Sequence, residues 1–304
     1  MAINLAHAAP APDTPDAPPS RSGWLRLADA GAANSAPRGA PPTMPPPRRR
    51  RSSALNGVVT ALSPALVGAM ALLIWQLIAQ SGAVSTYLLP TPAQVANSFA
   101  IALRSGMFVR YGETTLIESL VGFALGAVIA LPMGYAIARS RTLAAALEPY
   151  MAASQAIPAV ALAPLLALWL PYGLPPVAAL CALIVFFPAA VNTTLGFRTL
   201  DHEVVDAARL DGAGAWSLLR HIEAPLALPT ILAGLRASLT LSITGAVVGE
   251  FVVGDQGLGG LLTIARGNFD APLVFATLLA LALMATAMYG VARLLEWFLV
   301  YMEA

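Results

Sequence analysis

Six long apolar runs divide the sequence, and they decide what the chain can fold into. A run of about 20 apolar residues, at 1.5 Å per residue, crosses the ~30 Å hydrocarbon layer of a bilayer. In lipid, every backbone N–H and C=O needs a partner within its own segment, so each run is predicted to be a helix rather than a strand. The predicted spans are residues 58–78, 115–138, 147–170, 175–197, 227–253 and 272–300. We therefore expect an all-α membrane protein with six transmembrane helices, formed by residues 53–304.

The composition supports lipid as the solvent of this chain. Hydrophobic residues make up 58% of the 304 positions and charged residues only 11%, whereas a soluble domain carries about 25% charged residues. The formal net charge of +1 argues against a nucleic-acid partner, which would need a concentrated basic face. The sequence contains no lysine and no Walker-type glycine loop, so we expect no ATP hydrolysis by this chain itself.

The first 52 residues differ from the rest. They are rich in Ala, Pro, Ser and Gly and show neither helical nor strand periodicity. Such a segment cannot bury enough apolar surface to fold, so residues 1–52 are predicted to be a disordered tail.

The arginines predict the orientation in the membrane. Loops on one side of a six-span chain carry most of them, and lysine or arginine is enriched in cytoplasmic loops. These arginines are Arg48 to Arg51, Arg139, Arg141, Arg198, Arg209 and Arg220. Both termini are therefore expected in the cytoplasm of a bacterium, with the chain in the inner membrane. On the other side, Thr91 and Pro92 predict the start of an amphipathic helix near Ala93.

The one long polar segment between two spans is residues 201–229. Asp201 is a good N-cap, which predicts a short helix from there to about Asp211. Gly212 is expected to end that helix. A second short helix, 215–222, is expected to stop at Pro225. A slim, polar-edged helix of this kind is suited to a groove on another protein.

This segment resembles the EAA motif of binding-protein-dependent ABC importer permeases. The motif reads EAA, three residues, G, nine residues, then I-x-L-P. The matching residues here are Asp206, Ala207, Ala208, Gly212, Ile222 and Pro225. Asp206 and Ala224 stand where Glu and Leu are usual. The resemblance implies that loop 201–225 docks into a cleft of a separate ATPase subunit, in a bundle of the type I ABC importer kind.

Other motifs are similar to those of permeases for nitrate, taurine, alkanesulfonates and pyrimidine precursors. They are Leu89-Pro90-Thr91-Pro92, Ile157-Pro158, Ala163-Pro164-Leu165, Phe186-Phe187-Pro188, Gly249-Glu250-Phe251 and Gly257-Leu258-Gly259. The run 245–251 leans towards importers of thiamine-pyrimidine precursors or riboflavin. The resemblance implies two copies of this chain around a pore, two ATPase subunits, and a periplasmic solute-binding protein over the outer mouth.

Polar residues within the spans are candidates for lining the solute path. They are Gln155, Asn192, Thr193 and Glu250. A buried carboxylate is costly in lipid, so Glu250 either faces a pore or gate or bonds a neighbouring helix. The amide and hydroxyl groups could equally bond between helices. Glu118 is expected at the membrane interface. Glycines one turn apart, at 122, 126 and 134 and at 245 and 249, predict close helix packing.

Other classes of site fit poorly. The three histidines form no cluster, and Cys181 is the only cysteine, so neither a metal site, a cofactor site nor a redox pair is expected. A secondary active transporter, the main alternative, would carry paired intramembrane acids or broken helices at matching positions. Six spans with the single acid Glu250 fit that alternative poorly. An intramembrane hydrolase would need a nucleophile and a base inside the bilayer, and no span contains a histidine.

Overall fold

The computed structural model describes residues 54–253 and 256–303, which form helices and connecting turns with no strand among them. The tail predicted to be disordered, residues 1–52, lies outside the described residues. The chain divides into two compact units, Met1–Leu62 and Ser63–Ala304. The first helix, α2 (Ala54–Gln80), crosses that boundary and coincides with the first predicted span. The second unit contains everything that follows.

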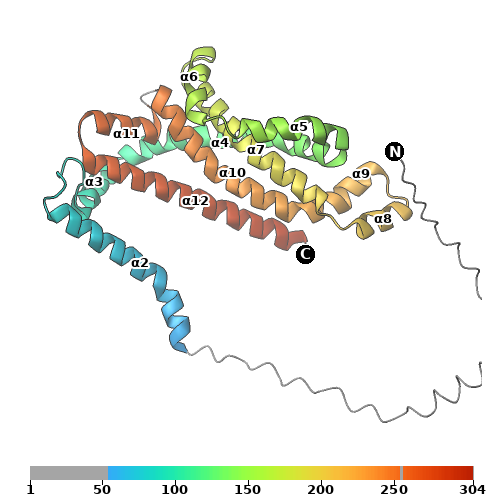
Figure 1. Ribbon diagram of the computed structural model, residues 1–304, viewed down its shortest axis with the longest axis horizontal. Helices are drawn as coiled ribbons and strands as arrows, with labels where there is room; N and C mark the ends of the chain where they lie inside the picture. Colours follow the sequence, from blue (N-terminus) through green and yellow to red (C-terminus); the bar gives the residue numbers. More distant parts are fainter. Residues whose placement is uncertain (1–53, 254–255, 304) are drawn as a thin grey trace, which may run out of the picture. The chain divides into compact units, whose positions relative to one another are not determined.

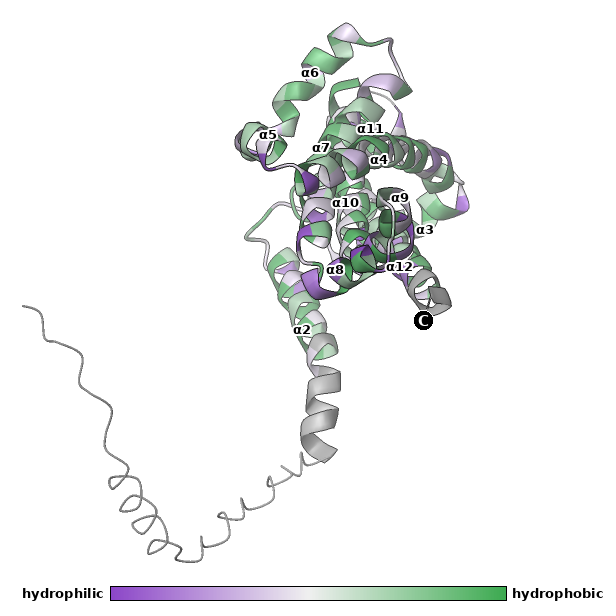
Figure 2. Ribbon diagram, turned by 90° about the vertical axis from the view of Figure 1, so that its right-hand side faces the viewer, coloured by the Kyte–Doolittle hydropathy of each residue, from purple (hydrophilic) through white to green (hydrophobic). Residues whose placement is uncertain are grey.

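Four long apolar helices dominate the second unit (Figure 1). They are α4 (Met107–Arg139), α7 (Leu174–Arg198), α10 (Ala224–Val253) and α12 (Ala271–Glu303). All four are long and apolar enough to cross a bilayer, and α10 is extended at its start by α9 (Ala215–Leu218) and a π-helical turn. Hydrophobic residues cover these helices, whereas hydrophilic residues gather on the short helix α8 (Figure 2). The described part of the chain is thus an all-helical membrane protein.

The predicted span 147–170 is not one straight helix. Residues there form α5 (Arg141–Ser154) and α6 (Ala159–Trp169), whose axes are bent by 97°. Pro158 lies in the break, where it has no N–H to continue the ladder and disfavours helical geometry at Ile157. Counted as one broken span, this pair raises the number of candidate spans in the described residues from four to five.

Shorter helices cover the ends of the bundle. α3 (Pro92–Arg104) begins close to the predicted Ala93, and a capping box between Thr91 and Gln94 stabilises its N-terminus. α8 (His202–Leu210) lies in the polar segment, and α11 (Gly257–Gly267) follows α10. Figure 1 shows α8 and α9 at one end of the bundle and α3 and α11 at the other.

Glycines allow α7 to pack closely against both α4 and α10. A Cβ built on Gly122 would lie 2.2 Å from the Cβ of Cys181, and one built on Gly245 would lie 3.0 Å from the Cα of Cys181. Such distances leave no room for a side chain, so the predicted role of these glycines in helix packing is confirmed.

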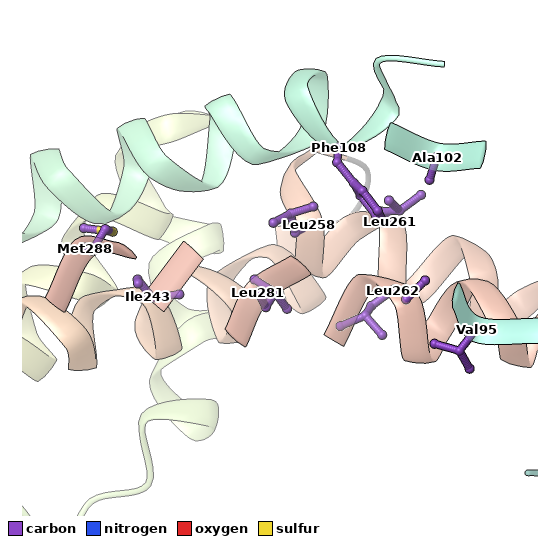
Figure 3. Packing of buried hydrophobic residues seen from close by; sticks show 10 residues of the cluster. Val95, Ala102, Phe108, Ile243, Leu258, Leu261, Leu262, Leu281 and Met288 are labelled. Atoms are coloured by element: carbon purple, nitrogen blue, oxygen red, sulfur yellow. The ribbon is translucent and has the colours of Figure 1, made fainter. Parts of the chain in front are cut away.

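A hydrophobic cluster joins the short helices to the long ones at the α11 end (Figure 3). Phe108 from α4 packs there with Leu258 and Leu261 from α11 and with Val95 from α3. Trp75 of α2 contacts Phe275 of α12 at 5.6 Å between ring centroids and donates a hydrogen bond to the Pro90 carbonyl. The cluster thus packs α11 against α4 and α3, and the Trp75 contacts join α2 to α12 and to the segment before α3.

Candidate functional site

Helix α8 has the caps that the sequence predicts. The Asp201 side chain accepts a hydrogen bond from the Glu203 N–H at 2.9 Å, which caps the helix start. At the other end Gly212 adopts φ +87°, and the Ala213 N–H donates to the Ala208 carbonyl at 3.1 Å. This left-handed turn is the usual glycine-dependent way to end a helix, so the predicted role of Gly212 is confirmed.

Most of the α8 surface is free of contacts within the chain. Val205 is its one buried side chain, whereas Asp206 and Ala207 are exposed and Ala208 is half-buried. Asp206 forms its ion pair with Arg209 of the same helix, at 2.9 Å. Leu210 is 89% exposed. An exposed apolar residue beside small and charged ones is the composition expected of a surface that another protein covers.

The chain continues from α8 into the bundle differently from the prediction. Pro225 does not stop the second helix, because a π-helical turn (Leu219–Glu223) connects α9 directly to α10. Proline cannot donate to the carbonyl four residues back, and its ring crowds that carbonyl. The wider π turn, in which the Ala224 N–H donates to the Leu219 carbonyl, accommodates it. Ile222 is half-buried in this turn.

An ion pair links this π turn to α4. Glu223 is only 3% exposed, and its Oε1 lies 3.3 Å from Nη1 of Arg139 in the last turn of α4. The other oxygen, Oε2, has no hydrogen-bond partner among the described residues. A second, exposed pair joins Arg198 of α7 to Glu148 of α5 at 2.8 Å. Sequence reasoning missed Glu223, because its partner lies far away along the chain.

Two buried acids lie at the opposite end of the bundle. Glu118 is 4% exposed and Glu250 is 1% exposed, so other side chains of the bundle cover both. The expectation that Glu118 lies at the membrane interface concerns its depth in the bilayer and stays a prediction. Both acids line one cavity of about 10 Å³. Glu118 comes from α4 and Glu250 from α10, so packing of these two helices creates the pair.

The start of α11 is held at the same place. The Gly259 N–H donates to Oε2 of Glu250, and the Leu258 N–H donates to the Thr115 hydroxyl of α4 at 2.8 Å. A carboxylate at a helix N-terminus is favourable, because it accepts from otherwise unpaired N–H groups and faces the positive end of the helix dipole. Glu250 therefore bonds a neighbouring helix, one of the two roles expected for it.

The other predicted pore residues do not gather around Glu250. Gln155 is exposed at the break between α5 and α6. Asn192 and Thr193 donate to carbonyls of their own helix, those of Pro188 and Ala189, at 2.8 and 2.7 Å. Thr193 also lines a cavity of about 550 Å³ near α9. The four residues form no single cluster.

A further charged pair inside the long helices escaped the sequence analysis. Arg236 of α10 bonds Glu296 of α12, and both side chains are mostly buried. The guanidinium also lies 5.2 Å from the ring centroid of Tyr289. The spans therefore hold several acids, and the expectation that Glu250 is the single one is wrong.

Comparisons with known proteins agree with this architecture. Residues 122–298 match the family model described as the binding-protein-dependent transport system inner membrane component. The chain is 45% identical over 233 residues to the riboflavin transport system permease protein RibX of Chloroflexus aurantiacus, covering 77% of this chain and 87% of that protein. It is 32% identical over 236 residues to the formylaminopyrimidine transport permease protein ThiX of Halalkalibacterium halodurans, covering 78% of this chain and 94% of that protein.

A third relative is the putative aliphatic sulfonates transport permease protein SsuC of Bacillus subtilis, 31% identical over 231 residues, covering 76% of this chain and 84% of that protein. A solved structure, of the MetNI methionine ABC transporter in inward-facing conformations, shares the fold. It superposes with a TM-score of 0.56 at 18% identity, covering 62% of this chain and 94% of the matched chain.

Family membership settles the class of the protein. A binding-protein-dependent ABC importer comprises a membrane permease, an ATPase and a solute-binding protein. The apolar helical bundle and the lack of a nucleotide-binding motif in the sequence both fit the permease. With family motif, helical fold and relatives in agreement, the chain belongs to the family of binding-protein-dependent transport system inner membrane components, as a multi-pass, non-catalytic permease subunit of an ABC importer.

Proposed function

We propose that two copies of this chain form the translocation path of an importer for a flat nitrogen heterocycle, and that α8 is the docking point for its ATPase. Each copy spans the membrane six times, through α2, the broken pair α5–α6, and the four long helices. Both termini and α8 face the cytoplasm, while α3 and α11 face the solute-binding protein. ATP-driven movement of the docked ATPases tilts the bundles and exposes the path to alternate sides.

The exposed surface of α8 is the observation that carries the docking proposal. Its apolar residues are left uncovered within the chain: Val204 is 46% exposed, Leu210 is 89% exposed, and the neighbouring Trp216 of α9 is 70% exposed. Burying apolar surface contributes about 25 cal/mol per Å², so a partner cleft that covers this surface gains affinity from it. The adjoining Asp206–Arg209 pair supplies polar contacts at the rim of that surface.

The solute class rests on the relatives. The names of the two relatives at 45% and 32% identity refer to riboflavin and formylaminopyrimidine, both of which contain a flat, nitrogen-rich ring system. The relative named for aliphatic sulfonates supports a second candidate class at 31% identity. Uptake into proteoliposomes containing the complete importer, with riboflavin, a formylaminopyrimidine and an alkanesulfonate offered separately, distinguishes them. Preferential uptake of the sulfonate would contradict the heterocycle proposal.

Docking is tested in the same complex by cysteine crosslinking. Cys181 is fully buried, so a cysteine introduced at Ala207 is the accessible thiol among the described residues. We expect Ala207→Cys to crosslink to the ATPase and a cysteine at the distant Arg266 not to do so. Crosslinking of position 266 but not 207 would place α8 on the wrong side of the membrane.

Two substitutions then separate docking from insertion. Gly212→Pro cannot adopt φ +87°, because proline fixes φ near −65°. Asp206→Arg reverses the charge next to Ala207. We expect both variants to insert in the membrane but to lose ATP-dependent uptake. Normal uptake by both would refute docking through α8.

A further inference from the structure

The π turn between α9 and α10 is a junction at which the docking segment meets two membrane helices. Along the chain it leads from α8 and α9 into α10. The turn is also linked to α4, because Glu223 forms an ion pair with Arg139 in the last turn of that helix. A displacement of α8 can therefore reach α10 through the backbone, and at this end of the bundle the ion pair adds a side-chain link from the same segment to α4.

The environment of Glu223 makes it depend on that single arginine. The carboxylate is 3% exposed, its Oε1 faces Arg139, and its Oε2 lacks a hydrogen-bond partner among the described residues. A buried charge that loses its partner is strongly unfavourable, because neither water nor another group replaces the lost interaction. The Arg139 side chain is itself 40% exposed, so only the carboxylate side of the pair is buried. That buried carboxylate distinguishes the pair from pairs in which both groups are exposed, which form and break at little cost.

Arg139 is positioned to act as a fixed partner. Its guanidinium lies 6.0 Å from the ring centroid of Tyr135, one turn earlier in α4, and that ring packs edge-on against Phe197 of α7 at 4.9 Å. The Arg139 guanidinium therefore lies near a packed aromatic pair, Tyr135 of α4 and Phe197 of α7. Its positive charge is also stabilised by the negative C-terminal end of the α4 helix dipole.

We propose that the Arg139–Glu223 pair is the positioning contact that makes α4 follow the ATPase-docking segment, so that α4 and α10 move together during transport. This inference rests on the proposed docking role of α8. The π turn supports it, because single π-helical turns inside helices occur frequently at functional sites and one here allows the helix to continue past Pro225. When Glu223 loses its partner, the docked ATPase still moves α10, but α4 lags behind.

The test measures coupling in the complete importer, reconstituted with its ATPase and binding protein. Glu223→Gln keeps the side-chain shape but removes the charge, and Arg139→Ala removes the partner. We expect both variants to hydrolyse ATP and to retain the Ala207→Cys crosslink to the ATPase. The number of solutes imported per ATP should fall at least about tenfold, the factor that corresponds to 1.4 kcal/mol.

Two further variants guard against a merely structural effect. Arg139→Lys keeps the charge and should restore most of the solute-to-ATP ratio. The double variant Arg139→Glu with Glu223→Arg restores an ion pair with reversed charges. Its solute-to-ATP ratio should be higher than that of either single variant. The control is Arg198→Ala, which breaks the exposed pair with Glu148 at the same end of the bundle and should leave the ratio unchanged.

The outcomes separate this inference from the docking proposal. A wild-type ratio in Glu223→Gln, with the crosslink retained, would overturn the role of the pair and leave α8 docking intact. An equal loss of coupling in Arg198→Ala would also overturn it, because a general weakening of that end of the bundle would then explain the result. Absence of the crosslink in the wild-type complex would instead refute docking itself.

Discussion

Replacing Gly122 by alanine tests whether the contact between α4 and α7 is as close as described. A Cβ at this position would lie 2.2 Å from the Cβ of Cys181 and 2.7 Å from the Ala178 carbonyl oxygen. Ordinary contact begins at 3.4 Å, so the first distance is short by 1.2 Å. A backbone oxygen and a Cβ cannot rotate away, so one of the two helices has to shift.

The expected magnitude follows from two opposing effects. Overpacking a close-packed interior costs about 1–3 kcal/mol, whereas Gly→Ala in a helix gains about 1 kcal/mol of helix propensity. Gly290 of α12 provides the matched control, because it is helical and has nothing within 4 Å of its would-be Cβ. Gly290→Ala should therefore show only the gain. The two variants should differ by the overpacking cost, about 1–3 kcal/mol.

Thermal unfolding of the purified permease in lipid nanodiscs, followed by circular dichroism, measures that difference. At about 2–4 °C per kcal/mol for a chain of this size, Gly122→Ala should melt about 2–12 °C below Gly290→Ala. The close approach of α4 to α7 would be refuted if Gly122→Ala melted at or above the temperature of the control.

Two other substitutions probe the charged groups. Glu250→Ala removes the oxygen acceptor at the start of α11, and a buried N–H left without a partner costs about 1–3 kcal/mol. We expect faster hydrogen exchange of the Gly259 amide, and unchanged exchange would contradict the capping role. Arg236→Ala leaves Glu296 without its partner and should lower the melting temperature more than the double variant Arg236→Ala with Glu296→Ala, because an unpaired buried charge costs more than a lost pair.

Local features of this fold could be read from the sequence, because short-range chemistry decides them. Asp201 and Gly212 set the start and end of α8 through hydrogen bonds to neighbours within a few residues. The four long helices follow from apolar runs that have no alternative structure in lipid. Family motifs around residues 206–212 then indicated the class of protein, which the comparisons confirm.

Features that depend on contacts between distant segments were missed. The sequence does not indicate that Glu118 and Glu250 line one cavity, because they lie on different helices, α4 and α10. Pro225 reads as a helix stop, because nothing nearby signals the π turn that accommodates it. Arg139 and Glu223 each look like charges of cytoplasmic loops, and only the tertiary fold joins them. For the acidic and basic side chains the missing information is a neighbour on a distant segment, and for Pro225 it is the backbone geometry of the turn before it.

α4 is linked to the segments on both sides of α10, to the π turn that precedes α10 and to α11 that follows it. Arg139 bonds Glu223 at one end, and at the other Thr115 and Glu250 hold consecutive N–H groups of α11. Thr115 and Arg139 are separated by 24 positions, or about 36 Å of helix at 1.5 Å per residue. A helix linked at two distant points resists sliding along its neighbours, so its expected motion is a rigid-body tilt. A tilt of about 10° around its midpoint would carry each end by about 3 Å, enough to change which side chains meet at a constriction.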